Sequence, residues 1–150
     1  MSPTLQEYFE ALYHNDPDST INFRIFPDKK DDIFTGTKLD IPLGQLGSVV
    51  AQLQKHNDQN RCIAAVVNSG GHSDRDITRI NAQFVEMDEG TFEEQQAKID
   101  AFPLPPSIVN QTEKSLHVYW LIDDSAVVKN FRSIQEALVK WFDGDPCCVN

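Results

Sequence analysis

At 150 residues the chain is long enough for one domain with a sizeable buried core, and its 40% hydrophobic and 24% charged residues are ordinary for a globular protein. No apolar run approaches the length of about 18 residues that indicates a membrane span. With 23 acidic against 13 basic residues, the net charge of −10 excludes general electrostatic attraction to nucleic acid, so such a partner would need metal ions, a few placed cations or further segments.

The first 60 residues predict two helices and one strand. Ser2 and Pro3 are typical of a helix start, and apolar residues at helical spacing carry this helix to Tyr13. Alternation of apolar and polar residues predicts a strand over 21–26, followed by a charged, solvated loop. A second amphipathic helix fits residues 43–56.

The remaining residues predict strands and two further helices. A continuous apolar run over 62–67 is typical of a central strand buried on both faces, and we expect it to form a long-looped hairpin with a strand over 77–87. Thr91 and Glu94 make a capping-box pattern for a helix that runs to about residue 101. Strands at 107–110 and 115–122 and a helix over 127–142 complete a mixed order that indicates an α+β fold.

The most informative stretch is the acidic end of the strand over 77–87. Glu86 and Asp88 are two residues apart, so on a strand their side chains share one face, whereas Val85 and Met87 point to the other. Adjacent carboxylates repel each other unless a cation lies between them. Mg²⁺ and Mn²⁺ bind carboxylate oxygens, so this pair predicts a divalent metal site.

Two later features fit the same chemistry. Ser115 and His117 share one face of the following strand, and a histidine beside a metal site can donate a hydrogen bond to a phosphate oxygen. Asp143 and Asp145 flank a glycine after the last helix, and either can be a third acidic ligand. A strand-borne carboxylate pair with a distant third acid is what two-metal phosphoryl transfer requires.

These motifs together resemble those of the archaeo-eukaryotic primase superfamily, the primase-polymerases, and most of all its branch in plasmids, phages and other mobile elements. The family's first motif, an apolar run with two acids one position apart, is matched by residues 84–88. Its second motif, serine-x-histidine on a strand, is matched by residues 115–117, and its acid after a further helix is matched by Asp145. The resemblance covers roughly residues 61–150.

The resemblance implies a nucleotidyltransferase that joins nucleoside triphosphates on a DNA template and releases pyrophosphate. It implies that Glu86, Asp88 and Asp145 bind two Mg²⁺ or Mn²⁺ ions and that His117 contacts the nucleotide phosphates. Ser115, Lys114 and Arg79 are further candidates for contact with the nucleotide or the template. For Lys114 and Arg79, ordinary surface charge is the alternative interpretation. A replicative helicase in the same or another chain is an expected partner.

The implied architecture is a single domain. It has an antiparallel RRM-like sheet with flanking helices, in which residues 1–60 form an accessory α/β part and residues 61–150 form the metal-site sheet. Members of the family usually continue past the third motif with an arginine-containing stretch, and this chain stops at Asn150, so we expect a shortened form of the domain. Glu86 stands where aspartate is commoner, which lengthens one ligand arm.

Two other functions fit the same residues. A metal-dependent nuclease or phosphohydrolase would use the same carboxylates, and a non-catalytic, replication-associated interaction module would suit the acidic net charge. A second metal site is conceivable at His72 with Asp74 and Asp76, although an ordinary polar loop explains these residues equally well.

The cysteines and the N-terminus indicate a cytoplasmic protein. Cys62, Cys147 and Cys148 are odd in number and lack zinc-like spacing, so reduced thiols are expected. The first residues lack the basic and apolar regions of a signal peptide, and we expect no membrane partner.

Overall fold

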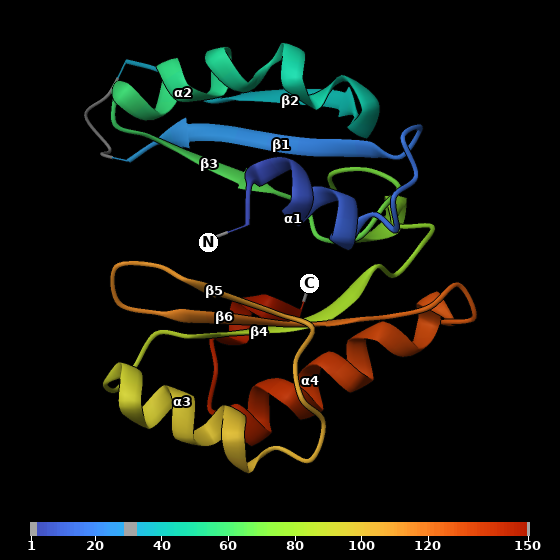
Figure 1. The fold of residues 1–150 in the computed structure, drawn as a ribbon, viewed down its shortest axis with the longest axis vertical. Coiled ribbons are helices and arrows are strands. Elements are labelled where there is room, and N and C mark those ends of the chain that lie inside the picture. Colours follow the sequence, from blue (N-terminus) through green and yellow to red (C-terminus); the bar gives the residue numbers. More distant parts are fainter. Residues whose placement is uncertain (1–2, 29–32, 150) are drawn as a thin grey trace. The chain divides into compact units, whose positions relative to one another are not determined.

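The computed structural model describes residues 3–28 and 33–149, which belong to two compact units, Met1–Thr78 and Arg79–Asn150. Each unit contains one three-stranded antiparallel sheet and two α-helices among its described residues (Figure 1). The predicted α+β class, with antiparallel strands and flanking helices, is therefore confirmed. None of the described helices has the length and apolar character that a membrane crossing requires.

The first unit has the strand order β2-β1-β3. Its elements are α1 (Leu5–Leu12), β1 (Thr20–Pro27), β2 (Thr37–Pro42), η1 (Leu43–Ser48), α2 (Val50–Asp58), β3 (Arg61–Ala65) and the short η2 (Asp74–Asp76). The N-cap of α1 is Thr4, which forms a capping box with Glu7. The expected N-cap, Ser2, and much of the predicted charged loop lie outside the described residues.

The predictions for this region differ from the structure in four respects. Strand β3 pairs with β1 and not with β4, so the expected hairpin of residues 62–67 with 77–87 does not form. Strand β3 is also an edge strand with partly exposed residues, not a central strand buried on both faces. Strand β2 was not predicted, and residues 61–78, expected in the metal-site sheet, lie in the first unit.

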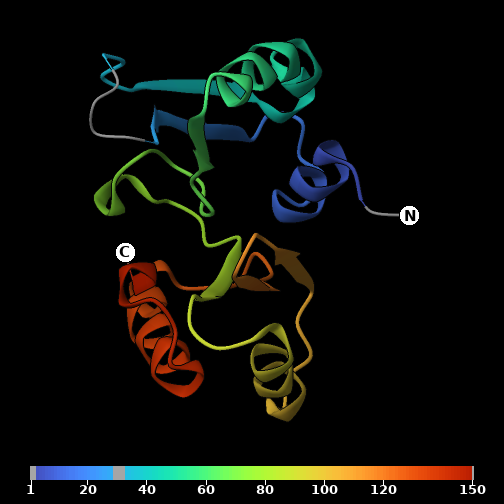
Figure 2. The ribbon, with the colours of Figure 1, turned by 90° about the vertical axis from the view of Figure 1, so that its left-hand side faces the viewer.

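The second unit has the strand order β4-β6-β5, so β4 and β5 are its edge strands. Its two long helices, α3 and α4, lie on the same side of this sheet (Figure 2). The elements are β4 (Ala82–Met87), α3 (Phe92–Ala101), β5 (Ile108–Gln111), β6 (Leu116–Leu121), η3 (Val128–Asn130), α4 (Phe131–Phe142) and η4 (Pro146–Val149). The predicted capping box of Thr91 with Glu94 is confirmed at the start of α3.

The core of the second unit lies between its sheet and its helices. Val85 and Met87 of β4 pack there with Val118 of β6 and with Phe142 of α4, all at most 1% exposed. Because neighbouring residues of a strand point to opposite faces, burial of Val85 and Met87 turns Glu86 toward the face away from the helices. The hydrophobic core thereby places the acidic side chain, as the alternation predicted.

Candidate metal centre

Glu86 and His117 lie directly opposite each other on β4 and β6. The Nδ1 atom of His117 is 3.5 Å from Oε1 of Glu86, which is an ion-pair separation and too long for a good hydrogen bond. The side chain of His117 is 23% exposed and that of Glu86 is 32% exposed, so both are partly shielded from water and still accessible. The first two sequence motifs therefore meet across neighbouring strands.

Asp88 follows the last residue of β4 and is exposed. Its Oδ1 accepts a hydrogen bond of 2.5 Å from the hydroxyl of Ser115, which is buried. The backbone N–H of Ser115 in turn donates to the Thr112 hydroxyl at 3.1 Å. The serine of the second motif thus orients the second acid of the first motif, a role that the sequence analysis did not assign to it.

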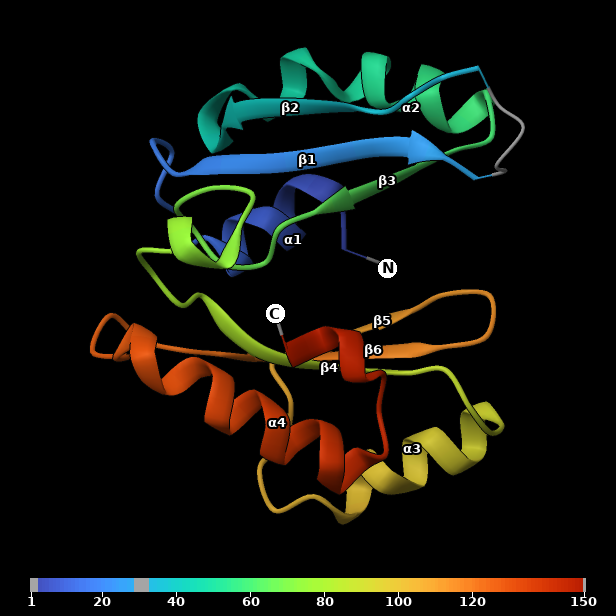
Figure 3. The same ribbon diagram turned by 180° about the vertical axis from the view of Figure 1, so that it is seen from behind.

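The third acid reaches the site because the chain after α4 turns back onto the free edge of β4. Asp143 is the left-handed C-cap of α4, with φ of 51°, and is exposed. The backbone N–H of Asp145 donates to the carbonyl oxygen of Glu86 at 2.8 Å, which fixes η4 beside β4 (Figure 3). Of the two acids that the sequence offered, the structure brings Asp145 to Glu86.

One group among the described residues combines three potential metal-ligand atoms, from Glu86, Asp145 and Cys148, all within 4.8 Å of one another. Asp88 is not in this group. The sequence analysis missed Cys148, because its contact with the acids depends on the return of the chain to β4. Burial raises the pKa of the Cys148 thiol to about 12, so this thiol is protonated at neutral pH.

The electrostatics of Glu86 fit a cation site. Burial raises the pKa of the Glu86 carboxyl above its ordinary value, and the charges of Asp88 and Asp145 raise it further, against the opposing effect of His117. A divalent cation among these carboxylates would offset both the desolvation and the repulsion. Oxygen donors of this kind suit Mg²⁺ and Mn²⁺.

The two cations proposed for nucleotide or template contact differ in their surroundings. The guanidinium of Arg79 forms an ion pair with Asp124. The backbone carbonyl of the exposed Lys114 accepts a hydrogen bond from the Gln95 side chain at 3.1 Å. Contact of either cation with a nucleotide or a template remains a prediction.

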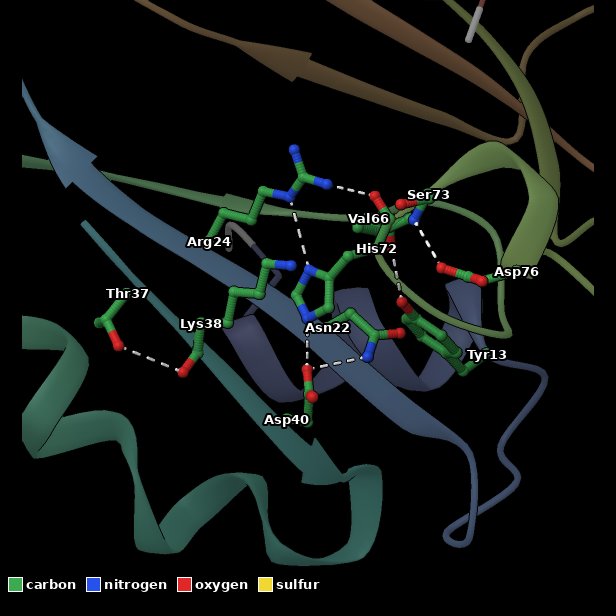
Figure 4. A network of polar contacts seen from close by, with 10 residues as sticks. All are labelled: Tyr13, Asn22, Arg24, Thr37, Lys38, Asp40, Val66, His72, Ser73 and Asp76. Atoms are coloured by element: carbon green, nitrogen blue, oxygen red, sulfur yellow. Dashed lines mark hydrogen bonds and ion pairs between the residues drawn. The ribbon is translucent and has the colours of Figure 1, made fainter. Parts of the chain in front are cut away.

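In the first unit, His72 is bonded to Asp40 and not to Asp74 or Asp76 (Figure 4). Its Nε2 lies 2.6 Å from Oδ1 of Asp40, and Nε of Arg24 donates to its Nδ1 at 3.4 Å. Since a guanidinium only donates, Nδ1 must accept and Nε2 must carry the proton that is donated to Asp40. The ring nitrogens of His72 are thus both engaged, which favours the polar-loop interpretation.

Comparison with known proteins identifies relatives by structure alone. No protein-family model matches the sequence, and the search of curated proteins found no match. The AEP domain of the cyanophage S-2L primase-polymerase is 26% identical, with a TM-score of 0.74 over 92% of this chain and 71% of that one. Two structures of the primase RepB′ are 11% identical, with TM-scores of 0.63 and 0.62 over 95% of this chain and 45% and 69% of theirs.

At 11% identity the RepB′ structures show the fold alone, whereas the cyanophage domain is also identical to the chain at about a quarter of the aligned positions. These solved neighbours support the archaeo-eukaryotic primase superfamily that the motifs indicated, in its mobile-element branch. The fold of the chain is that of nucleotidyltransferases with a primase-like role in replication.

Proposed function

We infer that the chain is a primase-polymerase catalytic domain that joins nucleotides on a DNA template and releases pyrophosphate. The observation that carries this proposal is the convergence of Glu86, Asp145 and His117 at the edge of a sheet whose fold matches a phage primase-polymerase. A DNA partner is supported by the RepB′ catalytic domain, whose structure was solved in complex with initiator DNA.

Each side chain has a defined task in this proposal. Glu86 and Asp145, with Asp88 beside them, would hold Mg²⁺ or Mn²⁺, and the bound ions would activate the attacking oxygen and neutralise phosphate charge. Ser115 keeps Asp88 in place through its hydroxyl. The Nδ1 atom of His117 faces Glu86, which leaves Nε2 to donate to a phosphate oxygen when the ring is protonated.

The acidic charge of the chain then sets a requirement on substrate binding. Triphosphates and DNA are anionic, so the carboxylate group at Glu86 repels both unless cations bind first. We therefore expect nucleotide binding to depend on the divalent metal.

A matched pair of variants tests the assignment. Asp88→Asn keeps the side-chain volume and an acceptor for the Ser115 hydroxyl and removes only the charge, so the fold should be retained while primer synthesis and extension with Mn²⁺ and labelled nucleotides are lost. Asp143→Asn is the control, because this exposed C-cap is left-handed, a conformation that asparagine tolerates, and it should keep activity. Full activity in Asp88→Asn would refute the assignment.

The same assay separates the nearest alternative. A metal-dependent nuclease built on these carboxylates would shorten a labelled single strand without added nucleotides, whereas the proposed enzyme lengthens a primer only when nucleotides are present.

A further inference from the structure

Gln95 of α3 and Gln135 of α4 are both fully buried. Burying an amide is costly unless its oxygen and its N–H groups find partners. Both glutamines find them on the backbone of the segments that carry the candidate metal ligands. Gln95 Nε2 contacts the carbonyl oxygens of Glu89, Gly90 and Lys114, at 3.1–3.4 Å.

Gln135 occupies the free edge of β4. An edge strand leaves every second N–H and C=O without a strand partner, and β4 pairs with a strand only on its β6 side. Oε1 of Gln135 accepts from the Phe84 N–H at 3.2 Å, and Nε2 donates to the Phe84 carbonyl. One side-chain amide thus takes the place of a neighbouring strand's peptide group.

The same amide group also reaches η4. Nε2 of Gln135 donates to the carbonyl oxygen of Cys148 at 2.7 Å, so its two protons and its oxygen are all used. The next outward-facing carbonyl of β4, that of Glu86, accepts from the Asp145 N–H. Gln135 therefore joins the two segments that carry Glu86 and Asp145.

We propose that Gln135 is a positioning residue that fixes the separation between the Glu86 and Asp145 carboxylates. Glu86 belongs to β4, whereas Asp145 directly precedes η4, a single short turn of four residues. The Gln135 amide adds a buried attachment of η4 to β4 beside the Asp145–Glu86 backbone bond. Residues that orient metal ligands typically change metal affinity by about 10–100-fold when they are mutated.

This inference rests on the proposed function only through metal binding, so its readout is Mn²⁺ affinity and not catalysis. Gln135→Met preserves the approximate volume and removes all three hydrogen bonds. In the full chain, titrated with Mn²⁺ and followed by the electron-paramagnetic-resonance signal of the free ion, we expect the Kd to rise about 10–100-fold. Leu138→Ala, one turn along α4 and packed against the core, controls for general destabilisation and should leave the Kd unchanged.

A milder variant covers the case in which Gln135→Met does not fold. Gln135→Asn keeps a neutral amide but is one methylene shorter, so it cannot reach Phe84 and Cys148 together, and it should also weaken Mn²⁺ binding. Wild-type affinity in either folded variant, or equal weakening in Leu138→Ala, would overturn the positioning role.

Hydrogen exchange provides a readout that needs no metal. In the wild-type chain, the Phe84 and Asp145 amide protons should exchange slowly and at similar rates, because one network holds both; rapid exchange at Asp145 would overturn the proposal. If the wild-type chain bound no Mn²⁺, the proposed function would fail, and faster Asp145 exchange in folded Gln135→Met than in the wild type would still show that Gln135 fastens η4 to β4.

Discussion

Each unit of the molecule contains a carboxylate–histidine pair, and the two pairs differ in how well their charges are satisfied. In the first unit, the Asn22 hydrogen bond and then His72 hold the pKa of the Asp40 carboxyl below its ordinary value, against the effect of burial. In the second unit, burial raises the pKa of Glu86 in spite of His117. Similar residue types thus give opposite pKa shifts.

The difference comes from the neighbours of each carboxylate. Asp40 accepts from an amide and an imidazole and lies near the charge of Lys38, so its negative charge is stabilised by donors and a cation. Glu86 shares one histidine with two further acids, Asp88 and Asp145. The first arrangement is complete by itself and fastens a loop, whereas the second would be completed by a cation under the proposed function, as expected of a functional site.

The close approach of Gly144 to β4 offers the largest expected effect on stability. A Cβ at Gly144 would lie 2.4 Å from Cγ2 of Val85 and 2.9 Å from the carbonyl oxygen of Glu86. Gly144→Ala must therefore push η4 away from β4, and we expect urea denaturation to show a loss of about 1–3 kcal/mol, with weaker Mn²⁺ binding.

A glycine of the first unit provides the matched control. A Cβ at Gly47 would meet no atom within 4 Å, so Gly47→Ala should change the free energy of unfolding by less than about 0.5 kcal/mol and leave metal binding unchanged. If Gly144→Ala and Gly47→Ala lowered the free energy of unfolding equally, the position of η4 beside β4 would not depend on the close approach of Gly144.

The pH dependence of stability should have opposite signs at the two carboxylates. For Glu86, whose folded pKa is raised above the ordinary value of 4.5, metal-free stability should fall as pH rises from that value through the folded pKa. Glu86→Gln should therefore raise the thermal midpoint of the metal-free chain at neutral pH, and the gain should disappear in acid.

For Asp40, whose folded pKa is lowered from 3.8, the stabilisation is present above that value and is lost as pH falls through the folded pKa. Asp40→Asn should lower the midpoint at neutral pH, by a modest amount because the carboxylate is half exposed. Thermal scans of both variants in a chelator across the acid range check these signs; shifts of the same sign would contradict the comparison.

The sequence predicted those parts of the fold and site that local periodicity determines. Alternation in residues 84–88 placed Glu86 opposite the buried side chains of β4, and the Thr91 capping box located the start of α3. Strand β2 escaped detection because only Leu39 and Ile41 carry its apolar pattern within a polar stretch.

Features that depend on contacts between distant segments were not predictable in this way. A continuous apolar run does not specify a partner strand, so residues 62–67 were paired with the wrong one. The residue pattern left Asp143 and Asp145 open, and the family resemblance selected Asp145. The nearness of Cys148 and the role of Gln135 follow from the return of η4 to the edge of β4. That return is set by tertiary packing around Gly144, for which the sequence has no local signal.

The central claim is that the carboxylates of the second unit need a cation and that the pair of the first unit does not. Calorimetric titration of the full chain with Mn²⁺ at neutral pH tests it directly. Mutation of residues that orient metal ligands typically weakens metal binding about 10–100-fold, and we expect Glu86→Gln, which removes a ligand charge, to weaken Mn²⁺ binding at least as much. Asp40→Asn should bind Mn²⁺ as the wild type does. Wild-type binding in Glu86→Gln, or equal weakening in both variants, would contradict the account.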